Sequence, residues 1–276
     1  MKKAGRNTAE VLVECLETHG VSHIFGVPGE ENLAFLEAVR KSKIKFIVTR
    51  DERGASFMAA TFGRITGKIG VAMSTLGPGA TNLLTGAAYA TLGGFPLLLI
   101  TGQKPIKKSK QGKFQIIDTV AMMKPVTKFS EVITDPDKVS LQVKNAIEIA
   151  ESGRKGSVHL ELPEDIADEK SRGGVPIIDK SEYVNPSKSK ITRDLKDIEN
   201  SKKPILILGR GANEESIRGA LEAFLEKTKI PFISTQLGKG VLDEASPLYV
   251  GTTALSNGEY VHEALRHADV IVVIGH

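Results

Sequence analysis

The chain has 276 residues, 41% of them hydrophobic, which suits two compact domains or one large one around a buried core. No apolar run is long enough to cross a bilayer, the basic N-terminal residues show no secretory signal, and the single cysteine, Cys15, excludes an internal disulfide framework. The net charge of +4 and the absence of Trp give no support to nucleic-acid binding, so we expect a cytoplasmic protein with no membrane or nucleic-acid partner.

The first hundred residues alternate between helical and strand patterns. Asn7 followed by Glu10 resembles a capping box that starts a helix, and Gly20 ends this helix. Strands are predicted over residues 23–27, 46–49, 71–75 and 97–101, and helices over residues 32–40, 52–65 and 80–90. Because such alternation implies βαβ crossovers, we expect an α/β fold with a doubly wound parallel sheet.

A helix over residues 138–152 and a strand over residues 157–162 complete this first domain, which we place at residues 1–170. Residues 171–190 are rich in Gly, Pro, Ser and Lys, a composition typical of an interdomain linker.

A second α/β module is expected over residues 191–276. Strand patterns occupy residues 205–208, 232–235 and 270–274, and a helix pattern occupies residues 214–227. The last apolar strand normally needs a covering helix and flanking strands. We therefore expect a Rossmann-like domain that is incomplete, in a fragment of a longer protein.

Glu52 stands where a predicted strand gives way to a helix, directly after Asp51. Acids at this place can simply interact with the positive end of the helix dipole, and for Glu52 taken alone this is the simpler interpretation. A carboxylate at a strand end can also act in general acid–base catalysis.

Two Gly/Pro turns follow two other predicted strands. Gly26-Val27-Pro28-Gly29 follows one strand, and Gly77-Pro78-Gly79 follows another and opens a helix. Glycine lets the backbone approach a flat ring closely, proline fixes the turn, and a helix start offers free N–H groups. Taken alone, Gly77-Pro78-Gly79 could be an ordinary βα loop. Together with Glu52, the turns predict a cofactor groove at one edge of the sheet.

Residues 49–82 resemble the aminopyrimidine-binding domain of thiamine diphosphate enzymes, and are most similar to the acetolactate synthase large-subunit family. Residues 50–55, RDERGA, are similar to the family's Arg-x-Glu-x-small-Ala stretch, and residues 77–82, GPGATN, match its next motif. The resemblance implies that Glu52 activates the cofactor. It further implies that the cofactor contacts Val27, Pro28, Gly29, Glu52, Thr75, Pro78, Gly79 and Asn82. Glu30 departs from the family, which often has a small residue there.

Phe114 and Gln115 resemble a pair that lies near the substrate and the thiazolium ring in acetolactate synthases. The resemblance therefore implies catalytic roles for both, beside Glu52. A loop leading into a packing segment is the alternative. A run of lysines comes just before them: Lys104, Lys107, Lys108, Lys110 and Lys113. We expect a solvated loop here rather than a phosphate or nucleic-acid site, because no aromatic residues interleave with the lysines.

Gly209-Arg210-Gly211 follows a strand but lacks the third glycine of a dinucleotide fingerprint. The segment resembles the family's central domain, in which some members bind FAD and others bind nothing. Arg154 matches a position that contacts FAD in the flavin-binding members. Whether Arg154, Gly209 and Gly211 hold FAD stays open.

The resemblance also implies Mg²⁺, which the family binds with a Gly-Asp-Gly segment followed by Asn. The chain has no Gly-Asp pair, and its histidines show no metal-ligand spacing, so we expect no metal ligands in these residues.

The main hypothesis is the N-terminal part of an acetolactate synthase, which condenses two pyruvates to 2-acetolactate with loss of CO₂ and assembles as a homodimer or homotetramer. The fragment alone is expected to be inactive. A second hypothesis keeps the fold and the cofactor but makes the protein another 2-oxoacid decarboxylase, oxidase or carboligase. A third makes it a non-catalytic partner of a full-length subunit.

Overall fold

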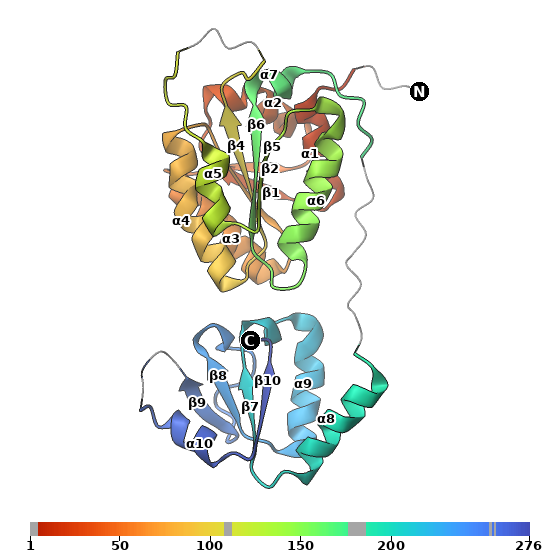
Figure 1. Ribbon diagram of the computed structural model, residues 1–276, viewed down its shortest axis with the longest axis vertical. Helices are drawn as coiled ribbons and strands as arrows, with labels where there is room; N and C mark the ends of the chain where they lie inside the picture. Colours follow the sequence, from red (N-terminus) through yellow and green to blue (C-terminus); the bar gives the residue numbers. More distant parts are fainter. Residues whose placement is uncertain (1–4, 108–111, 176–185, 254–255, 257) are drawn as a thin grey trace. The chain divides into compact units, whose positions relative to one another are not determined.

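The computed structural model describes residues 5–107, 112–175, 186–253, 256 and 258–276 (Figure 1). The chain forms two compact units, Met1–Ser181 and Glu182–His276. Each unit is built on a parallel β-sheet, which confirms the predicted α/β class. Part of the predicted linker, residues 176–185, lies outside the described residues, and helix α8 (Lys188–Asn200) begins within the rest of it.

The first unit has a six-stranded parallel sheet with the strand order β2-β1-β3-β4-β6-β5. The strands are β1 (His23–Gly26), β2 (Lys45–Val48), β3 (Gly70–Ser74), β4 (Leu97–Gln103), β5 (Phe129–Val132) and β6 (Ser157–Pro163). Strands β3, β4 and β6 are buried along their whole length, as expected for central strands of a sheet that is covered on both faces.

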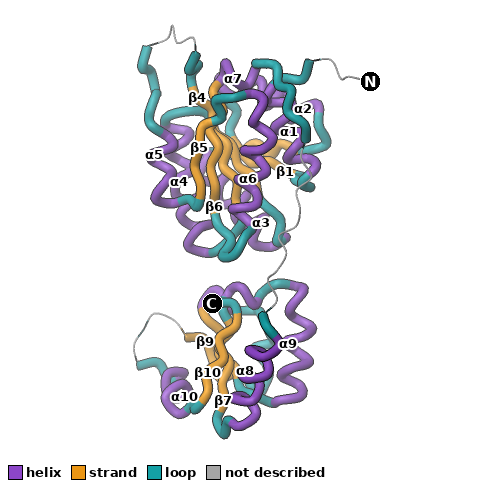
Figure 2. The backbone as a smooth tube through the Cα atoms, turned by 45° about the vertical axis from the view of Figure 1, so that its right-hand side comes forward, coloured by secondary structure: helices purple, strands orange, loops and turns teal. Residues whose placement is uncertain are grey.

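Helices cover both faces of this sheet, as Figure 1 shows and as Figure 2 shows from a second side. They are α1 (Thr8–Thr18), α2 (Leu33–Lys41), α3 (Glu52–Thr66), α4 (Pro78–Gly93), α5 (Thr119–Met123), α6 (Val139–Glu151) and α7 (Glu164–Asp168), with short 3₁₀ turns at Glu30–Asn32, Lys124–Val126 and Pro136–Lys138. Val71 and Met73 belong to a core with residues of α1, α2 and α6, whereas Ala72 belongs to a core with residues of α3 and α4. Alternate residues of β3 therefore serve opposite faces.

The second unit has a four-stranded parallel sheet with the order β10-β7-β8-β9. Its strands are β7 (Pro204–Leu208), β8 (Phe232–Thr235), β9 (Tyr249–Thr253) and β10 (Val270–Ile274). Its helices are α8, α9 (Glu215–Thr228) and α10 (Val261–His267), and 3₁₀ turns lie at Arg210–Ala212 and Gln236–Gly238.

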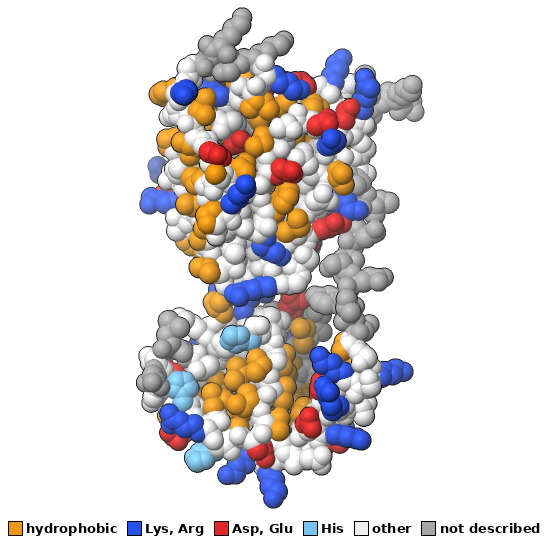
Figure 3. All heavy atoms as spheres, viewed as in Figure 1, with side chains coloured by type: hydrophobic (Ala, Val, Ile, Leu, Met, Phe, Trp, Pro, Cys, Tyr) orange, Lys and Arg blue, Asp and Glu red, His pale blue; other side chains and the backbone are white. Residues whose placement is uncertain are grey.

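Strand β10 has one covered face and one open face. Val272 and Ile274 pack against the core that includes Leu221 and Leu225 of α9. Ile271 and Val273 point the other way and are 46% and 54% exposed. Hydrophobic side chains accordingly gather on the visible face of this unit, over its strands, in Figure 3.

Within the described ranges, no helix is both long and apolar enough to cross a membrane. Those same ranges contain no group of three or more His, Cys, Asp or Glu residues placed to hold a metal ion.

Candidate cofactor site

The loops that follow β1, β2 and β3 contain most of the predicted site. These strands are neighbours in the sheet and run parallel, so their carboxyl ends lie along one edge. Crevices at this edge are where open α/β sheets bind ligands.

Glu52 is the first residue of α3 and is 9% exposed. The helix is capped by its neighbour: Oδ1 of Asp51 accepts a hydrogen bond from the N–H of Gly54 at 2.8 Å. That backbone hydrogen bond holds the pKa of the Asp51 carboxyl below its usual range. Because Asp51 already caps the helix, the Glu52 carboxylate is available for another purpose. Its Oε2 accepts a hydrogen bond from Nδ2 of Asn82 at 2.9 Å.

The Gly77-Pro78-Gly79 turn brings the start of α4 against Glu52. A Cβ atom on Gly79 would lie 3.1 Å from Oε1 of Glu52 and 3.0 Å from Cγ2 of Thr75. Gly77 has φ +53°, a backbone conformation that favours glycine, and a Cβ there would lie 2.4 Å from the carbonyl oxygen of Gln115. Pro78 is the first residue of α4, where its fixed φ suits a helix start.

The turn after β1 packs on the same group of residues. A Cβ on Gly29 would lie 2.5 Å from Cβ of Thr75, so the two loops touch without room for a further side chain. Val27 is half-buried, and Pro28 is exposed. The structure therefore brings together Gly29, Thr75, Gly79, Glu52 and Asn82, and Val27 and Pro28 lie just before Gly29 in its turn.

The Phe114–Gln115 segment meets this group through its backbone. Gln115 has a left-handed φ of 58° and its carbonyl faces Gly77, while the side chain of Phe114 is 72% exposed. The catalytic roles of Phe114 and Gln115 remain predictions, as do the cofactor contacts of the two turns.

Gln103, the last residue of β4, contacts the Phe114–Gln115 loop at its C-terminal end. The sequence did not predict this role. Its Nε2 donates hydrogen bonds to the carbonyl of Ile117 at 3.4 Å and to Oε2 of Glu161 at 3.2 Å. Burial raises the pKa of the Glu161 carboxyl.

Lys104 contradicts the expectation of a solvated lysine run. It is only 9% exposed, and its Nζ lies 2.7 Å from Oε1 of the equally buried Glu31. Lys107 is exposed and pairs with Glu169, and Lys113 is exposed, as expected. Lys108 and Lys110 lie outside the described residues. An acid far away in sequence compensates Lys104, so neither composition nor local spacing could reveal its burial.

Of the three residues considered for FAD, Arg154 belongs to the first unit, and Gly209 and Gly211 belong to the second. Arg154 is in the loop before β6, at the amino edge of the first sheet, and its Nη2 donates to the carbonyl of Leu92 at 2.6 Å. In the second unit, the N–H of Gly209 donates to the carbonyl of Ile274 at 2.8 Å, and that of Gly211 to the carbonyl of Gly275 at 2.7 Å. These two N–H groups are therefore already engaged.

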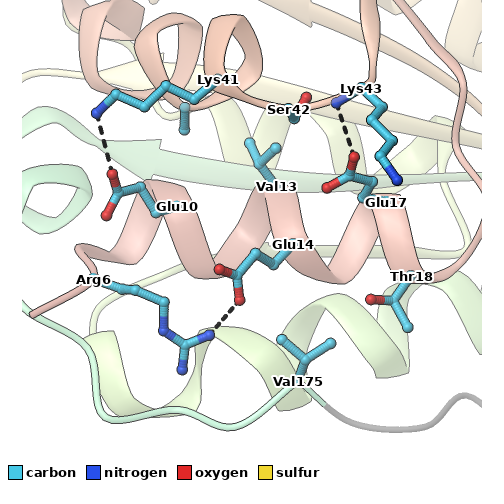
Figure 4. A pocket seen from close by; sticks show the side chains of 11 residues that line it. Arg6, Glu10, Val13, Glu14, Glu17, Thr18, Lys41, Ser42, Lys43 and Val175 are labelled. Carbon is cyan, nitrogen blue, oxygen red and sulfur yellow. Dashed lines mark hydrogen bonds and ion pairs between the residues drawn. The ribbon is translucent and has the colours of Figure 1, made fainter. Parts of the chain in front are cut away.

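A separate groove crosses α1 and α2 and is lined by none of the predicted site residues (Figure 4). Its carboxylates are each engaged: Glu10 pairs with Lys41 at 3.3 Å, Glu14 pairs with Arg6, and Glu17 accepts from the N–H of Lys43 at 2.8 Å. Because each of its carboxylates already has a partner, the groove gives no indication of a ligand.

A thiamine ring fits the chemistry of the edge formed by β1, β2 and β3. A buried carboxylate is oriented by an amide, and the glycine turns beside it leave backbone rather than side chains near it. Mg²⁺ does not fit the described residues in the same way, because they contain no set of acidic ligands for it.

Comparison with known proteins identifies both units. Residues 6–122 match the family described as "Thiamine pyrophosphate enzyme, N-terminal TPP binding domain", and residues 191–276 match "Thiamine pyrophosphate enzyme, central domain".

The chain is 35% identical to the "Probable acetolactate synthase large subunit" of Methanocaldococcus jannaschii, over 97% of this chain and 46% of that protein. It is 34% identical to the "Acetolactate synthase" of Arthrospira platensis, over 97% of this chain and 48% of that protein, and 32% identical to that of Bacillus subtilis, over 97% and 47%. The chain thus spans about half the length of the curated relatives that it matches. Since the two matched domains lie in their expected order along one chain, this chain belongs to the thiamine pyrophosphate enzymes.

Proposed function

We propose that this chain supplies the aminopyrimidine-binding half of a thiamine diphosphate site in a protein that condenses two pyruvates to 2-acetolactate and releases CO₂. The observation on which the proposal rests is the Glu52 carboxylate, buried at the carboxyl edge of the sheet and hydrogen-bonded by Asn82. Similarity to proteins named acetolactate synthase supports this choice of reaction.

Glu52 is the residue that would hold a proton at a ring nitrogen of the cofactor. A buried carboxylate beside a neutral amide can share a proton with a nitrogen base, as general acid–base catalysis requires. When bound, thiamine diphosphate supplies the electron sink that allows a 2-oxoacid to lose CO₂. Asn82 would keep the carboxylate in one orientation. The walls around the cofactor would be formed by Val27, Pro28, Gly29, Thr75, Pro78 and Gly79.

Phe114 and Gln115 would lie on the side of the site where the substrate binds, because the carbonyl of Gln115 faces Gly77, the first residue of the Gly77-Pro78-Gly79 turn. The exposed Phe114 side chain is free to contact pyruvate or another 2-oxoacid. Gln103 would limit the movement of this loop through its hydrogen bond to Ile117.

The cofactor's diphosphate and its Mg²⁺ would be held by residues other than these. We propose that such residues come from a further domain and that the protein works as a homodimer or homotetramer in the cytoplasm. FAD is not part of the proposal, because the N–H groups of Gly209 and Gly211 and the Nη2 of Arg154 already donate to backbone carbonyls.

Product analysis tests this function. The protein expressed from its native gene is incubated with pyruvate, thiamine diphosphate and Mg²⁺, and the products are separated. Acetolactate is the expected product. Acetaldehyde or acetyl phosphate would assign the protein to the decarboxylases or oxidases instead, and no turnover combined with capture of a complete subunit would favour the non-catalytic partner.

A further inference from the structure

Glu31 joins three neighbouring strand ends at the proposed cofactor edge. It lies in the 3₁₀ turn Glu30–Asn32, just after the Gly/Pro turn that follows β1. Its Oε1 lies 2.7 Å from Nζ of Lys104, the residue that follows β4, and its Oε2 accepts a hydrogen bond from Oγ1 of Thr75, the residue that follows β3. Each carboxylate oxygen therefore holds a different strand end.

The Glu31–Lys104 pair is almost fully removed from water. The side chains of Lys104 and Glu31 are 10% and 7% exposed. Burial disfavours the charge on Glu31, but the hydrogen bonds from Lys104 and Thr75 outweigh this effect and hold the pKa of the Glu31 carboxyl below its usual range. Buried ion pairs of this kind contribute little net stability compared with apolar residues of similar size, so stability alone does not account for the pair.

Thr75 is the residue through which the pair reaches the site. Its side chain lies between the two glycine turns, because a Cβ on Gly29 would lie 2.8 Å from Oγ1 and a Cβ on Gly79 would lie 3.0 Å from Cγ2. The hydrogen bond to Glu31 fixes the rotamer of Thr75 and so the separation of the two turns. Gly79 in turn lies against Glu52.

We propose that Glu31 and Lys104 are positioning residues that act through Thr75. They set the spacing between the Gly29 and Gly79 backbones, which form the two sides of the proposed cofactor site and are called the cradle below. Lys104 neutralises and orients the Glu31 carboxylate. Glu31 then holds the Thr75 hydroxyl, and Thr75 keeps the Gly29 and Gly79 backbones at a fixed spacing. The identity of the cradle as a thiamine site rests on the function proposed above, whereas the mechanical coupling does not.

Hydrogen exchange of individual amides in the 276-residue chain tests the coupling. The amides of Asn32, Gly79 and Thr81 donate hydrogen bonds to the carbonyls of Gly29, Leu76 and Gly77, so they report opening of the two turns. Thr75→Val removes only the hydroxyl and leaves the Glu31–Lys104 pair in place. We expect exchange at these three amides to become at least tenfold faster in Thr75→Val, and in Glu31→Gln.

Three controls separate positioning from general destabilisation. The amide of Ile133, bonded to the carbonyl of Glu161, should keep its rate in every variant, because global unfolding would accelerate all amides together. Thr75→Ser retains the hydroxyl, which lies against Gly29, and should restore slow exchange at Asn32. Glu14→Gln breaks the Arg6–Glu14 pair elsewhere and should leave all three reporters unchanged.

The proposal is overturned if Thr75→Val leaves the three amides within about twofold of the parent chain, or if the Asn32 amide exchanges as fast in Thr75→Ser as in Thr75→Val. Should Thr75→Val not fold, Glu31→Gln decides by the same criterion. No cofactor enters the measurement, so this failure would leave the proposed function standing. An active Glu52→Gln enzyme would refute the function without changing the exchange result.

Discussion

Asn82 donates a hydrogen bond from Nδ2 to Oε2 of Glu52 at 2.9 Å, and this bond joins the fifth residue of α4 to the first residue of α3. Glu52 is buried, so an amide contact fixes the direction of its carboxylate more firmly than water would. The other oxygen, Oε1, is left beside Gly79. The orientation of the proposed acid is therefore determined by two different helices.

Replacing Glu52 with Gln in the active protein should lower kcat by a factor of about 100 to 10,000, the usual contribution of a general acid or base. Glutamine keeps the shape of the side chain but cannot hold the proton. Steady-state acetolactate formation measures the effect. Glu37→Gln, an exposed acid on α2 paired with Arg40, is the matched control and should retain full activity. Near-normal turnover of Glu52→Gln would remove Glu52 from the mechanism.

Replacing Asn82 with Ala should lower kcat by about tenfold, because the carboxylate of Glu52 loses its orienting donor, a loss equivalent to ~1.4 kcal/mol. A double-mutant cycle with Glu52→Gln is the informative measurement. We expect the Asn82 effect to vanish once Glu52 is changed, since neighbouring residues that act together are not additive. Glu37→Gln, on α2 and paired with Arg40, again serves as the control. Fully additive effects would mean that Asn82 acts independently of Glu52.

Gly77→Ala and Gly67→Ala form a second matched pair. Both glycines have left-handed φ, +53° and +68°, but an added Cβ meets the carbonyl of Gln115 at 2.4 Å only at Gly77, and nothing within 4 Å at Gly67. We expect Gly67→Ala to cost about 1 kcal/mol for its backbone conformation alone. Gly77→Ala should cost at least about 1 kcal/mol more and displace the Phe114–Gln115 loop. Denaturant unfolding measures the difference, and equal costs would contradict the packing of Gln115 against this turn.

Buried His159 should make the protein less stable in acid. It is 0% exposed, its ring nitrogens lie 2.9 Å from Oγ1 of Thr101 and 2.8 Å from Oγ of Ser130, and burial lowers its pKa from 6.5 to about 3. Between these two pKa values the unfolded chain binds a proton that the folded chain does not. The free energy of unfolding therefore falls with decreasing pH through this window, by about 1.4 kcal/mol per pH unit from this group.

The measurement for His159 is the free energy of unfolding at several pH values between 7 and 4, in the parent chain and in His159→Gln. The variant should have a shallower dependence on pH over that range, although it should be less stable at pH 7 because the site is buried. Identical slopes in the two proteins would show that His159 does not titrate as the structure indicates.

These 276 residues alone should form no acetolactate from pyruvate, thiamine diphosphate and Mg²⁺. The reason is chemical: the sequence contains no Gly-Asp pair for a Gly-Asp-Gly segment, and the described residues contain no acidic metal site. The DNA sequence of the gene is the accompanying observation, since a reading frame that encodes such a segment would explain where Mg²⁺ binds. Acetolactate production by the chain alone would refute this prediction.

The regular elements of the first hundred residues could be predicted because their periods are long and clear. Helix α3, predicted over residues 52–65, is observed at Glu52–Thr66, and β4, predicted over residues 97–101, continues to Gln103. Helix α5 and strand β5 were not predicted. A five-residue helix and a half-buried edge strand are too short for their hydrophobic periodicity to be recognised. Helix α8 was not predicted, because its first three residues fall in the predicted linker and the apolar Ile191, Leu195 and Ile198 that follow are interspersed with charged residues.

The site was predictable only to the extent that it depends on local sequence. Glu52, the two Gly/Pro turns and Asn82 could be placed at one sheet edge, because parallel strand ends meet there. Lys104, Glu31 and Gln103 could not, since each is defined by a partner on another strand end or loop. Burial of a lysine depends on such a partner, and a single sequence does not show which acid provides it.

The open face of β10 has a consequence for the behaviour of the protein in solution. Among the described strands β10 ends the second sheet, so its outer backbone groups and the exposed Ile271 and Val273 lie together on one accessible margin. An unpaired apolar margin is a template on which another extended chain can assemble. In these 276 residues, that strand is therefore where pairing with another extended chain is expected.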